Sequence, residues 1–385
     1  MISTQRLLFD LPEDEIYLNA AYMTPTPLSV AEAGHIGIQR KLNPASIGEK
    51  EFFQAPQEVR KLFSQLINGD DPDRIAIFPS VSYGLANVAQ NIKPGYGNEI
   101  ILVEDQFPSA VFPWDPETSH FNINTISLPN LYKNRGERLT QAIVDAIEDR
   151  TAAVCIGLVL WTDGTRYDLK QIAEKCKKHG TLLILDGTQA IGALNFDLAE
   201  IRPDALICAS YKWLMGPYGL TLGYFGEAFD DGQPVENNWI NRSHSEDFTS
   251  LTSYQKEYRP KAHRYNSGEY SAFVHIPMIK KSLELILNWG VKNIEEYCNY
   301  LSSELFDSLA QSKTYWIEPD PAFRSNHIIG IHLLQPEMRS RLETAFREKK
   351  IHVSLRSDCV RISPHLYNTK KDMYALMDVL LSLES

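Results

Sequence analysis

The chain reads LLILDGTQ from Leu182 to Gln189 and DALICASYKW from Asp204 to Trp213, and these two stretches decide the predicted fold. Each is an apolar run of the kind that forms a buried β-strand, and each ends in polar residues. Strands of an open α/β sheet present their carboxyl ends at the edge where ligands bind. We therefore expect Asp186 and Lys212 to face one ligand site.

The bulk composition excludes several classes of partner. The net charge of -11 over 385 residues disfavours nucleic acid and anionic membrane surfaces, because both attract basic proteins. No apolar run is long enough to span a membrane, and the first residues lack the apolar core of a signal peptide. The five cysteines are scattered without metal-site spacing, so we expect free thiols, no metal site and a cytoplasmic location.

The order of the patterns predicts the domain organisation. Strand and helix patterns alternate from about residue 74 to 225, which predicts a mostly parallel sheet covered by helices on both faces. After about residue 276, a long helical stretch interrupted at Gly290 leads into short strands and a final helix. Because 385 residues are more than a single hydrophobic core usually accommodates, we predict two domains and a terminal segment. They are a large domain over 21–280, a small domain over 281–385, and an N-terminal segment over 1–20 that packs with the small domain.

A turn of small residues, Gly-Pro-Tyr-Gly at 216–219, follows the lysine. The acid, the lysine and this turn resemble the core of the pyridoxal-phosphate enzymes of fold type I, within them the class V aminotransferase family. That family includes cysteine desulfurases, kynureninases and isopenicillin-N-epimerase-like proteins, and the resemblance covers about residues 15–380. It implies an α/β fold with a mostly parallel seven-stranded sheet between helices, plus a smaller α+β C-terminal domain. It also implies pyridoxal 5'-phosphate as cofactor, and a homodimer with its active sites at the interface.

Three residues are predicted to carry the chemistry of the cofactor. Lys212 is the expected Schiff-base lysine, whose amine condenses with the cofactor aldehyde and later shuttles the substrate Cα proton. Asp186 is expected to pair with the pyridine nitrogen and keep it protonated, so that the ring accepts electrons from a substrate carbanion. The resemblance implies that Gln189 donates a hydrogen bond to the phenolic oxygen of the cofactor.

Further residues are predicted to hold the cofactor phosphate and ring. The segment PSVSYG at 79–84 links a strand to a helix, and a helix N-terminus offers free N–H groups and a positive dipole end. The resemblance aligns Ser82, next to Val81, with the phosphate-binding residue of the family. Tyr211 is expected to add a hydroxyl group, and Phe107 is expected to stack on the pyridine ring.

The substrate is expected to meet a buried arginine. Arg361 interrupts an apolar strand, and its context, Arg-x-Ser-x-x-x-Tyr-Asn-Thr, resembles the carboxy-terminal motif of the family. In that motif the arginine binds the substrate α-carboxylate through two hydrogen bonds. Arg356 is a second candidate with a poorer alignment. The resemblance also places Asn19, Ala20 and Trp161 at the substrate pocket.

Two further predictions concern contacts between this chain and a neighbouring subunit. In the resembled family, the segment YNSGE at 265–269, with Asn266 and Ser267, reaches the phosphate of the partner subunit. Trp239 stands where kynureninase-like relatives place an interface tryptophan. Both expectations depend on the homodimer.

The reaction is left open by the sequence. A cysteine desulfurase requires a mobile cysteine before the carboxylate-binding arginine, but Cys359 lies two residues from Arg361 in the same expected strand. Desulfurases also carry histidine where this chain has Tyr211. The predicted enzyme therefore acts on the α- or β-carbon of a small amino acid as an epimerase, lyase or kynureninase-like hydrolase. A transaminase and a cysteine desulfurase or selenocysteine lyase are the alternatives.

Two other classes of protein fit the sequence less well, an inactive relative and a dehydrogenase. An inactive relative that only binds the cofactor is the non-enzyme alternative, although such a protein has no need of Lys212, Asp186 and Arg361 together. A dinucleotide-dependent dehydrogenase is disfavoured because no Gly-x-Gly-x-x-Gly follows the first strand.

Overall fold

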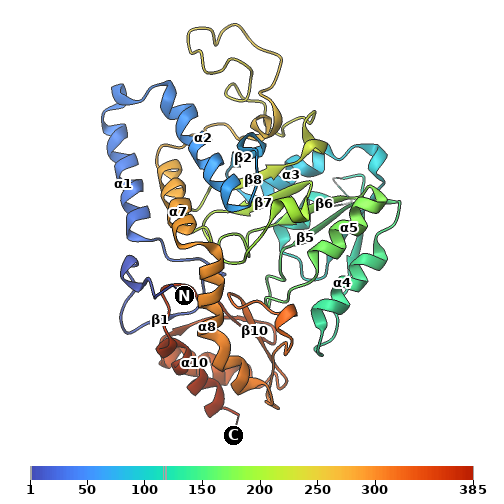
Figure 1. Cartoon of the computed structure of the whole chain (residues 1–385), viewed down its shortest axis with the longest axis vertical. Helices are drawn as coiled ribbons and strands as arrows, with labels where there is room; N and C mark the ends of the chain where they lie inside the picture. Colours follow the sequence, from blue (N-terminus) through green and yellow to red (C-terminus); the bar gives the residue numbers. More distant parts are fainter. Residues whose placement is uncertain (1, 116, 118, 385) are drawn as a thin grey trace.

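The computed structural model describes residues 2–115, 117 and 119–384, and a seven-stranded sheet forms its centre (Figure 1). Its strands are β2 (Ile75–Phe78), β3 (Glu99–Val103), β4 (Asn122–Ile126), β5 (Thr151–Gly157), β6 (Leu182–Asp186), β7 (Ala205–Ala209) and β8 (Thr221–Phe225). They are ordered β2-β8-β7-β6-β5-β3-β4. Strand β8 is antiparallel to both of its neighbours, and all other neighbouring pairs are parallel. The predicted α/β fold with a mostly parallel seven-stranded sheet is confirmed.

The sheet is buried on both faces because successive strand residues point to opposite sides. In β6, Leu183 and Leu185 join one apolar cluster, while Leu182 and Ile184 join another. Among the helices that pack in the first cluster are α2 (Glu49–Leu66), α4 (Arg135–Ala146), α5 (Leu169–His179), α6 (Leu198–Ile201) and α7 (His275–Trp289). Helix α3 (Val81–Asn91) packs in the second. The central strands therefore lack a solvent-facing side, which explains their unbroken apolar sequences.

Local capping signals fix the ends of helix α5. The carboxylate of Asp168 accepts a hydrogen bond from the Gln171 N–H at 3.0 Å, which satisfies a free donor of the first turn. At the other end, Gly180 adopts a left-handed backbone with φ of 69°, a conformation that glycine reaches without a steric penalty. Both ends are therefore set by residues next to the helix.

A second, smaller sheet lies in the C-terminal part of the chain. It is antiparallel, in the order β12 (Ser354–Arg356), β13 (Cys359–Ile362), β10 (Ile329–Leu333), β9 (Tyr315–Trp316). Its helices are α8 (Val291–Leu309), α9 (Met338–Glu348) and α10 (Lys370–Ser382). Helix α8 runs down from the large body to this sheet (Figure 1). The predicted smaller α+β unit is confirmed.

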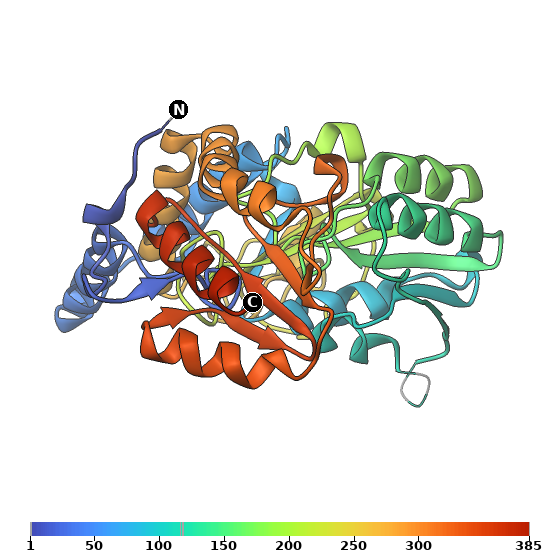
Figure 2. The ribbon, with the colours of Figure 1, turned by 90° about the horizontal axis from the view of Figure 1, so that it is seen from below.

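The N-terminal segment lies against the C-terminal elements. Strand β1 (Ile16–Tyr17) pairs in parallel with β11 (Ile351–His352), and Figure 2 shows this blue segment beside the red and orange ones. Helix α1 (Leu28–Leu42) then lies at the outer edge of the large body (Figure 1). The predicted boundary at residue 281 falls within α7, and the division of the chain into domains stays a prediction.

Two general expectations concern the thiols and the membrane. All five cysteines are buried and free, as predicted for a chain without disulfides. Among the described residues, no helix combines the length and the apolar character needed to cross a membrane.

Candidate active site

A cavity of about 240 Å³ opens at the carboxyl ends of the central parallel strands. Gly157 of β5, Asp186 of β6 and Ala209 of β7, each the last residue of its strand, all line it. This is the edge of an open α/β sheet at which ligands bind. The predicted site residues that line the cavity are Val81, Phe107, Trp161, Asp186, Gln189, Tyr211 and Lys212.

Lys212 occupies the turn after β7 and is 6% exposed. Its Nζ lies 5.4 Å from the centre of the Phe107 ring and 5.6 Å from that of Tyr211. Burial lowers the pKa of Lys212 to about 8, with help from the charges of Arg361 and Arg356 and against the opposing effect of Asp186. A larger share of this amine is therefore neutral near pH 7 than for an exposed lysine, and the neutral amine is the nucleophile.

Asp186 ends β6 and lines the same cavity as Lys212. Its Oδ1 accepts a hydrogen bond from the Thr188 N–H at 2.9 Å, which fixes the carboxylate. Burial raises the pKa of Asp186, while Thr188 and the charge of Lys212 act in the opposite direction. A half-buried carboxylate of this kind gains from a cationic hydrogen-bond donor, such as a protonated pyridine nitrogen.

The side chain of Gln189 is partly committed to the protein. Its Nε2 donates to the Ala21 carbonyl oxygen at 3.0 Å, and its Oε1 accepts from Trp213 Nε1 at 3.0 Å. The amide nitrogen carries a second hydrogen. The predicted donation to the phenolic oxygen stays a prediction, but Gln189 also ties the N-terminal segment to the wall of the cavity, a role that the sequence did not indicate.

The N-terminus of α3 forms another part of the wall. Ser80 caps the helix by accepting from the Tyr83 N–H at 3.2 Å, and both Ser80 and Val81 line the cavity. Ser82 is exposed and lies outside the lining. In the described part of the chain, no acceptor is assigned to the backbone N–H of Val81 or Ser82. Free N–H groups at a helix N-terminus suit a phosphate.

Arg361 lies in β13 with its side chain fully buried. Its Nη1 donates to the Trp161 carbonyl oxygen at 2.7 Å, whereas Nε and Nη2 are buried without a partner among the described residues. Burial and the charge of Arg356 lower the pKa of Arg361 to about 9. Two free donors on one edge of a guanidinium match the two oxygens of a carboxylate.

Of the other predicted substrate residues, one lines the cavity and two lie outside its lining. Trp161 lines the cavity, donates from Nε1 to the Asp105 carbonyl oxygen at 2.6 Å, and packs edge-on against Phe107 at 5.3 Å. Asn19 accepts from Ser354 Oγ at 3.1 Å, and Ala20 is fully buried. Neither Asn19 nor Ala20 lines this cavity.

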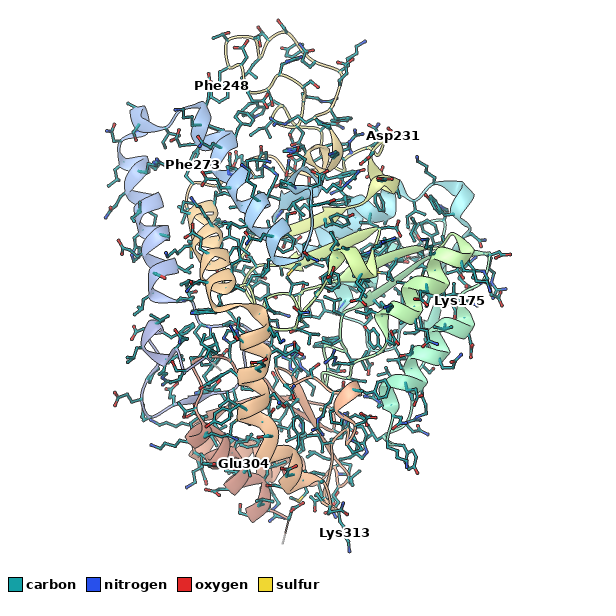
Figure 3. The ribbon with its side chains drawn as sticks, viewed as in Figure 1. Lys175, Asp231, Phe248, Phe273, Glu304 and Lys313 are labelled. Atoms are coloured by element: carbon teal, nitrogen blue, oxygen red, sulfur yellow. The ribbon has the colours of Figure 1, made fainter. Side chains whose placement is uncertain are left out.

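Trp239 and Ser267 lie apart from the cavity of their own chain. Trp239 packs against Phe52 and Phe248, and Figure 3 labels Phe248 at the loop that projects from the large body. The backbone N–H of Ser267 donates to the Ile77 carbonyl oxygen at 3.2 Å, and Asn266 Oδ1 accepts from the Ile77 N–H. Their predicted contact with a partner subunit stays a prediction.

Several lining residues were missed from the sequence, namely Gln106, Ser109, Thr188 and Tyr218. Gln106 and Ser109 flank the predicted Phe107, and Thr188 stands between Asp186 and Gln189. Their positions next to predicted residues were the available signal. The ring of Tyr218 packs at 4.8 Å from that of Tyr211, at the opening of the cavity.

The donor set of this cavity fits pyridoxal phosphate. A lysine amine suits the aldehyde, a carboxylate suits the ring nitrogen, a helix N-terminus suits the phosphate, and an aromatic ring is available for stacking. The unpartnered donors of Arg361 are consistent with an amino-acid substrate beside it.

Comparison with known proteins agrees with this geometry. The chain is 25% identical to an uncharacterized aminotransferase, YcbU, of Bacillus subtilis over 86% of this chain and 84% of that protein. It is 26% identical to isopenicillin N epimerase of Streptomyces clavuligerus over 47% of this chain and 46% of that protein. The cysteine desulfurase CsdA of Escherichia coli superposes with a TM-score of 0.80 at 18% identity, covering 98% of this chain and 96% of that one.

The family assignment rests on the length of the match. The family model described as aminotransferase class-V matches residues 16–376, nearly the whole chain. The protein therefore belongs to the class-V aminotransferase family, whose enzymes depend on pyridoxal phosphate.

Proposed function

We propose that this protein removes the Cα proton of a small amino acid, with Lys212 as the proton carrier. The observation that carries the proposal is the placement of a buried lysine and a half-buried aspartate in one cavity. The neutral amine that the low pKa of Lys212 favours is both the nucleophile needed to attach the cofactor and the base needed at Cα.

When bound, pyridoxal phosphate supplies an aldehyde that condenses with amines and a ring that withdraws electrons from Cα. Asp186 would hold the ring nitrogen protonated, and the N-terminus of α3 would hold the phosphate. Phe107, whose ring centre lies 5.4 Å from Lys212 Nζ, would cover one face of the ring. These contacts would fix the plane of the ring relative to Lys212.

Arg361 would orient the amino acid in that plane. Its free Nε and Nη2 would donate to the two oxygens of one carboxylate, while Nη1 already donates to the backbone carbonyl of Trp161. A carboxylate fixed by two parallel hydrogen bonds leaves the Cα–H bond in one orientation. The α-amino acid is therefore held by its carboxylate at one end and by the cofactor at the other.

The position of Cys359 does not support a desulfurase reaction. This residue is 4% exposed, is paired between β10 and β12, and has a pKa raised well above its ordinary value by burial. A buried strand thiol neither moves to a substrate sulfur nor ionises readily. The proposal therefore covers epimerase, lyase and hydrolase chemistry, which share the Cα proton step.

Proton exchange in deuterium oxide tests this proposal directly. The cofactor-loaded protein is incubated with L- and D-amino acids, and the loss of the Cα–H signal is followed by nuclear magnetic resonance. We expect exchange for at least one amino acid, and none with Lys212→Ala. Exchange that survives in Lys212→Ala, or a wild type that exchanges none of the panel, would contradict the proposal.

We also propose a homodimer. Helix α1, at the edge of the body, leaves Ile36, Ile38 and Leu42 more than half exposed, which is unusual for large apolar residues without a partner surface (Figure 1). We expect the wild type to sediment as a dimer and an Ile36→Asp/Ile38→Asp variant as a monomer. Tyr374→Asp, at an exposed aromatic residue of α10, is the control that should stay dimeric. A wild-type monomer would refute this part.

A further inference from the structure

Two arginines share one face of the small sheet. In the antiparallel pair of β12 and β13, Arg361 lies opposite Ser354, and Arg356 lies opposite Cys359. Opposite residues of an antiparallel pair point to the same side, and so do residues two apart along a strand. Arg356 and Arg361 therefore project toward the same region.

That region is the wall of the cavity formed by Trp161. The guanidinium carbon of Arg356 lies 4.4 Å from the centre of the indole ring, and that of Arg361 lies 5.9 Å from it. The two guanidinium groups are thus no farther apart than the sum of these distances. A stacked arginine keeps the hydrogens at the edge of its plane free for a ligand.

Both cations lack an anion. Among the described residues, no carboxylate forms an ion pair with either arginine, and Nε of Arg356 is buried without a partner, as are Nε and Nη2 of Arg361. Asp163, the buried acid of the neighbouring loop, is bound by Arg135 and His332. Of the residues that the structure describes, Asp186 is the only acid that lines the cavity, and the proposed function assigns it to the cofactor.

One carboxylate does not satisfy the unpaired donors of both Arg356 and Arg361. The free edge of Arg361 has two donors, which one carboxylate uses completely. Arg356 then remains a half-buried cation with an unpartnered Nε, beside a second cation. Leaving the buried Nε of Arg356 unpaired is costly, and a second anionic group at this place would satisfy it.

We propose that the substrate is an amino acid with a second acidic group in its side chain, and that Arg356 binds this group while Arg361 binds the α-carboxylate. This assignment rests on the proposed function for the place of the amino acid. Arg356 is then the residue that determines specificity.

Calorimetric titration with acid and amide pairs tests the assignment. The probes are L-aspartate against L-asparagine and L-glutamate against L-glutamine, which differ in charge and little in size. We expect the acid of at least one pair to bind about ten- to a hundredfold more tightly than its amide, the value of one charge-assisted hydrogen bond. In Arg356→Gln this ratio should fall to near one, and in Arg356→Lys it should fall only in part.

Arg347→Gln is the matched control, because Arg347 is exposed on α9 of the same part of the chain. It should keep the full acid preference, and thermal unfolding should show that every variant is folded. Equal binding of acid and amide by the wild type would overturn the assignment, and so would a preference that survives in Arg356→Gln. Calorimetry measures the binding of the amino acid, whereas proton exchange at Cα measures the proposed reaction. A failure of the Arg356 assignment is therefore distinguishable from a failure of the proposed function.

Discussion

Arg361 of the small sheet donates a hydrogen bond of 2.7 Å to the backbone carbonyl of Trp161, 200 residues earlier in the chain. The bond joins the two parts of the molecule at the wall of the cavity, because Trp161 lines it and packs against Phe107. It also turns the guanidinium so that Nε and Nη2 remain for a carboxylate. One backbone contact thus orients the residue to which we assign substrate binding.

Replacement of this arginine is expected to weaken substrate binding without loss of the cofactor. Arg361→Gln should raise the Kd for the amino acid about a hundred- to ten-thousandfold, because two charge-assisted hydrogen bonds are lost. Cofactor content, measured by absorbance, should be unchanged. Arg347→Gln is again the control. A variant that binds the amino acid as tightly as the wild type would exclude Arg361 from the site.

Asp186→Asn isolates the charge of the carboxylate. The amide oxygen can still accept from the Thr188 N–H, so the fold should be retained. Without the negative charge, the ring nitrogen is no longer held protonated, and we expect Cα exchange to slow about ten- to a hundredfold. Exchange at the wild-type rate in a fully loaded variant would show that Asp186 does not act on the ring.

The pH dependence of cofactor attachment should report the pKa of Lys212. Since the neutral amine reacts, the rate at which cofactor-free protein takes up pyridoxal phosphate should rise with pH through about 8 and level off above it. Arg356→Gln removes a nearby positive charge, so the midpoint should move to higher pH. A midpoint near that of a free lysine would contradict the buried setting of this amine.

The buried ion pair of Asp163 predicts a stability effect. Burial raises the pKa of Asp163, but the hydrogen bond from His332 and the charge of Arg135 outweigh this and lower it below its ordinary value. Because the pKa is lower in the folded than in the unfolded chain, this stabilisation is present above about pH 4 and is lost as the pH falls. Asp163→Asn should lower the free energy of unfolding by about 3–5 kcal/mol.

Denaturant unfolding at neutral and acidic pH measures this effect. Glu200→Gln, which breaks the exposed pair with Lys170, is the matched control and should leave the free energy of unfolding nearly unchanged. Equal losses in both variants would mean that the pair of Asp163 and Arg135 contributes no more than a surface pair.

The fold and the centre of the site were predictable because they depend on local patterns. The apolar runs that end at Asp186 and before Lys212 are buried strands, and strand order brings their ends to one cavity. The capping of the last helix by Thr369 and Asp372 was also visible in sequence. Each of these signals lies within a few residues.

What could not be predicted depends on contacts between distant segments. The sequence does not show that Gln189 bonds to Ala21 and Trp213, or that Arg361 bonds to Trp161. Ser82 aligns with a phosphate-binding position, yet its side chain lies outside the cavity because the helix begins at Val81 and turns it outward. The strand β4 was missed because its residues, NINTI, lack a continuous apolar run.

The central claim is that Lys212 carries the cofactor. The purified protein, loaded with pyridoxal phosphate, is reduced with borohydride, digested and analysed by mass spectrometry. We expect one modified peptide, in which Lys212 carries the added mass of the reduced cofactor. This modified peptide should be absent without borohydride and in Lys212→Ala. Modification of another lysine in the wild type, or none at all, would contradict the account.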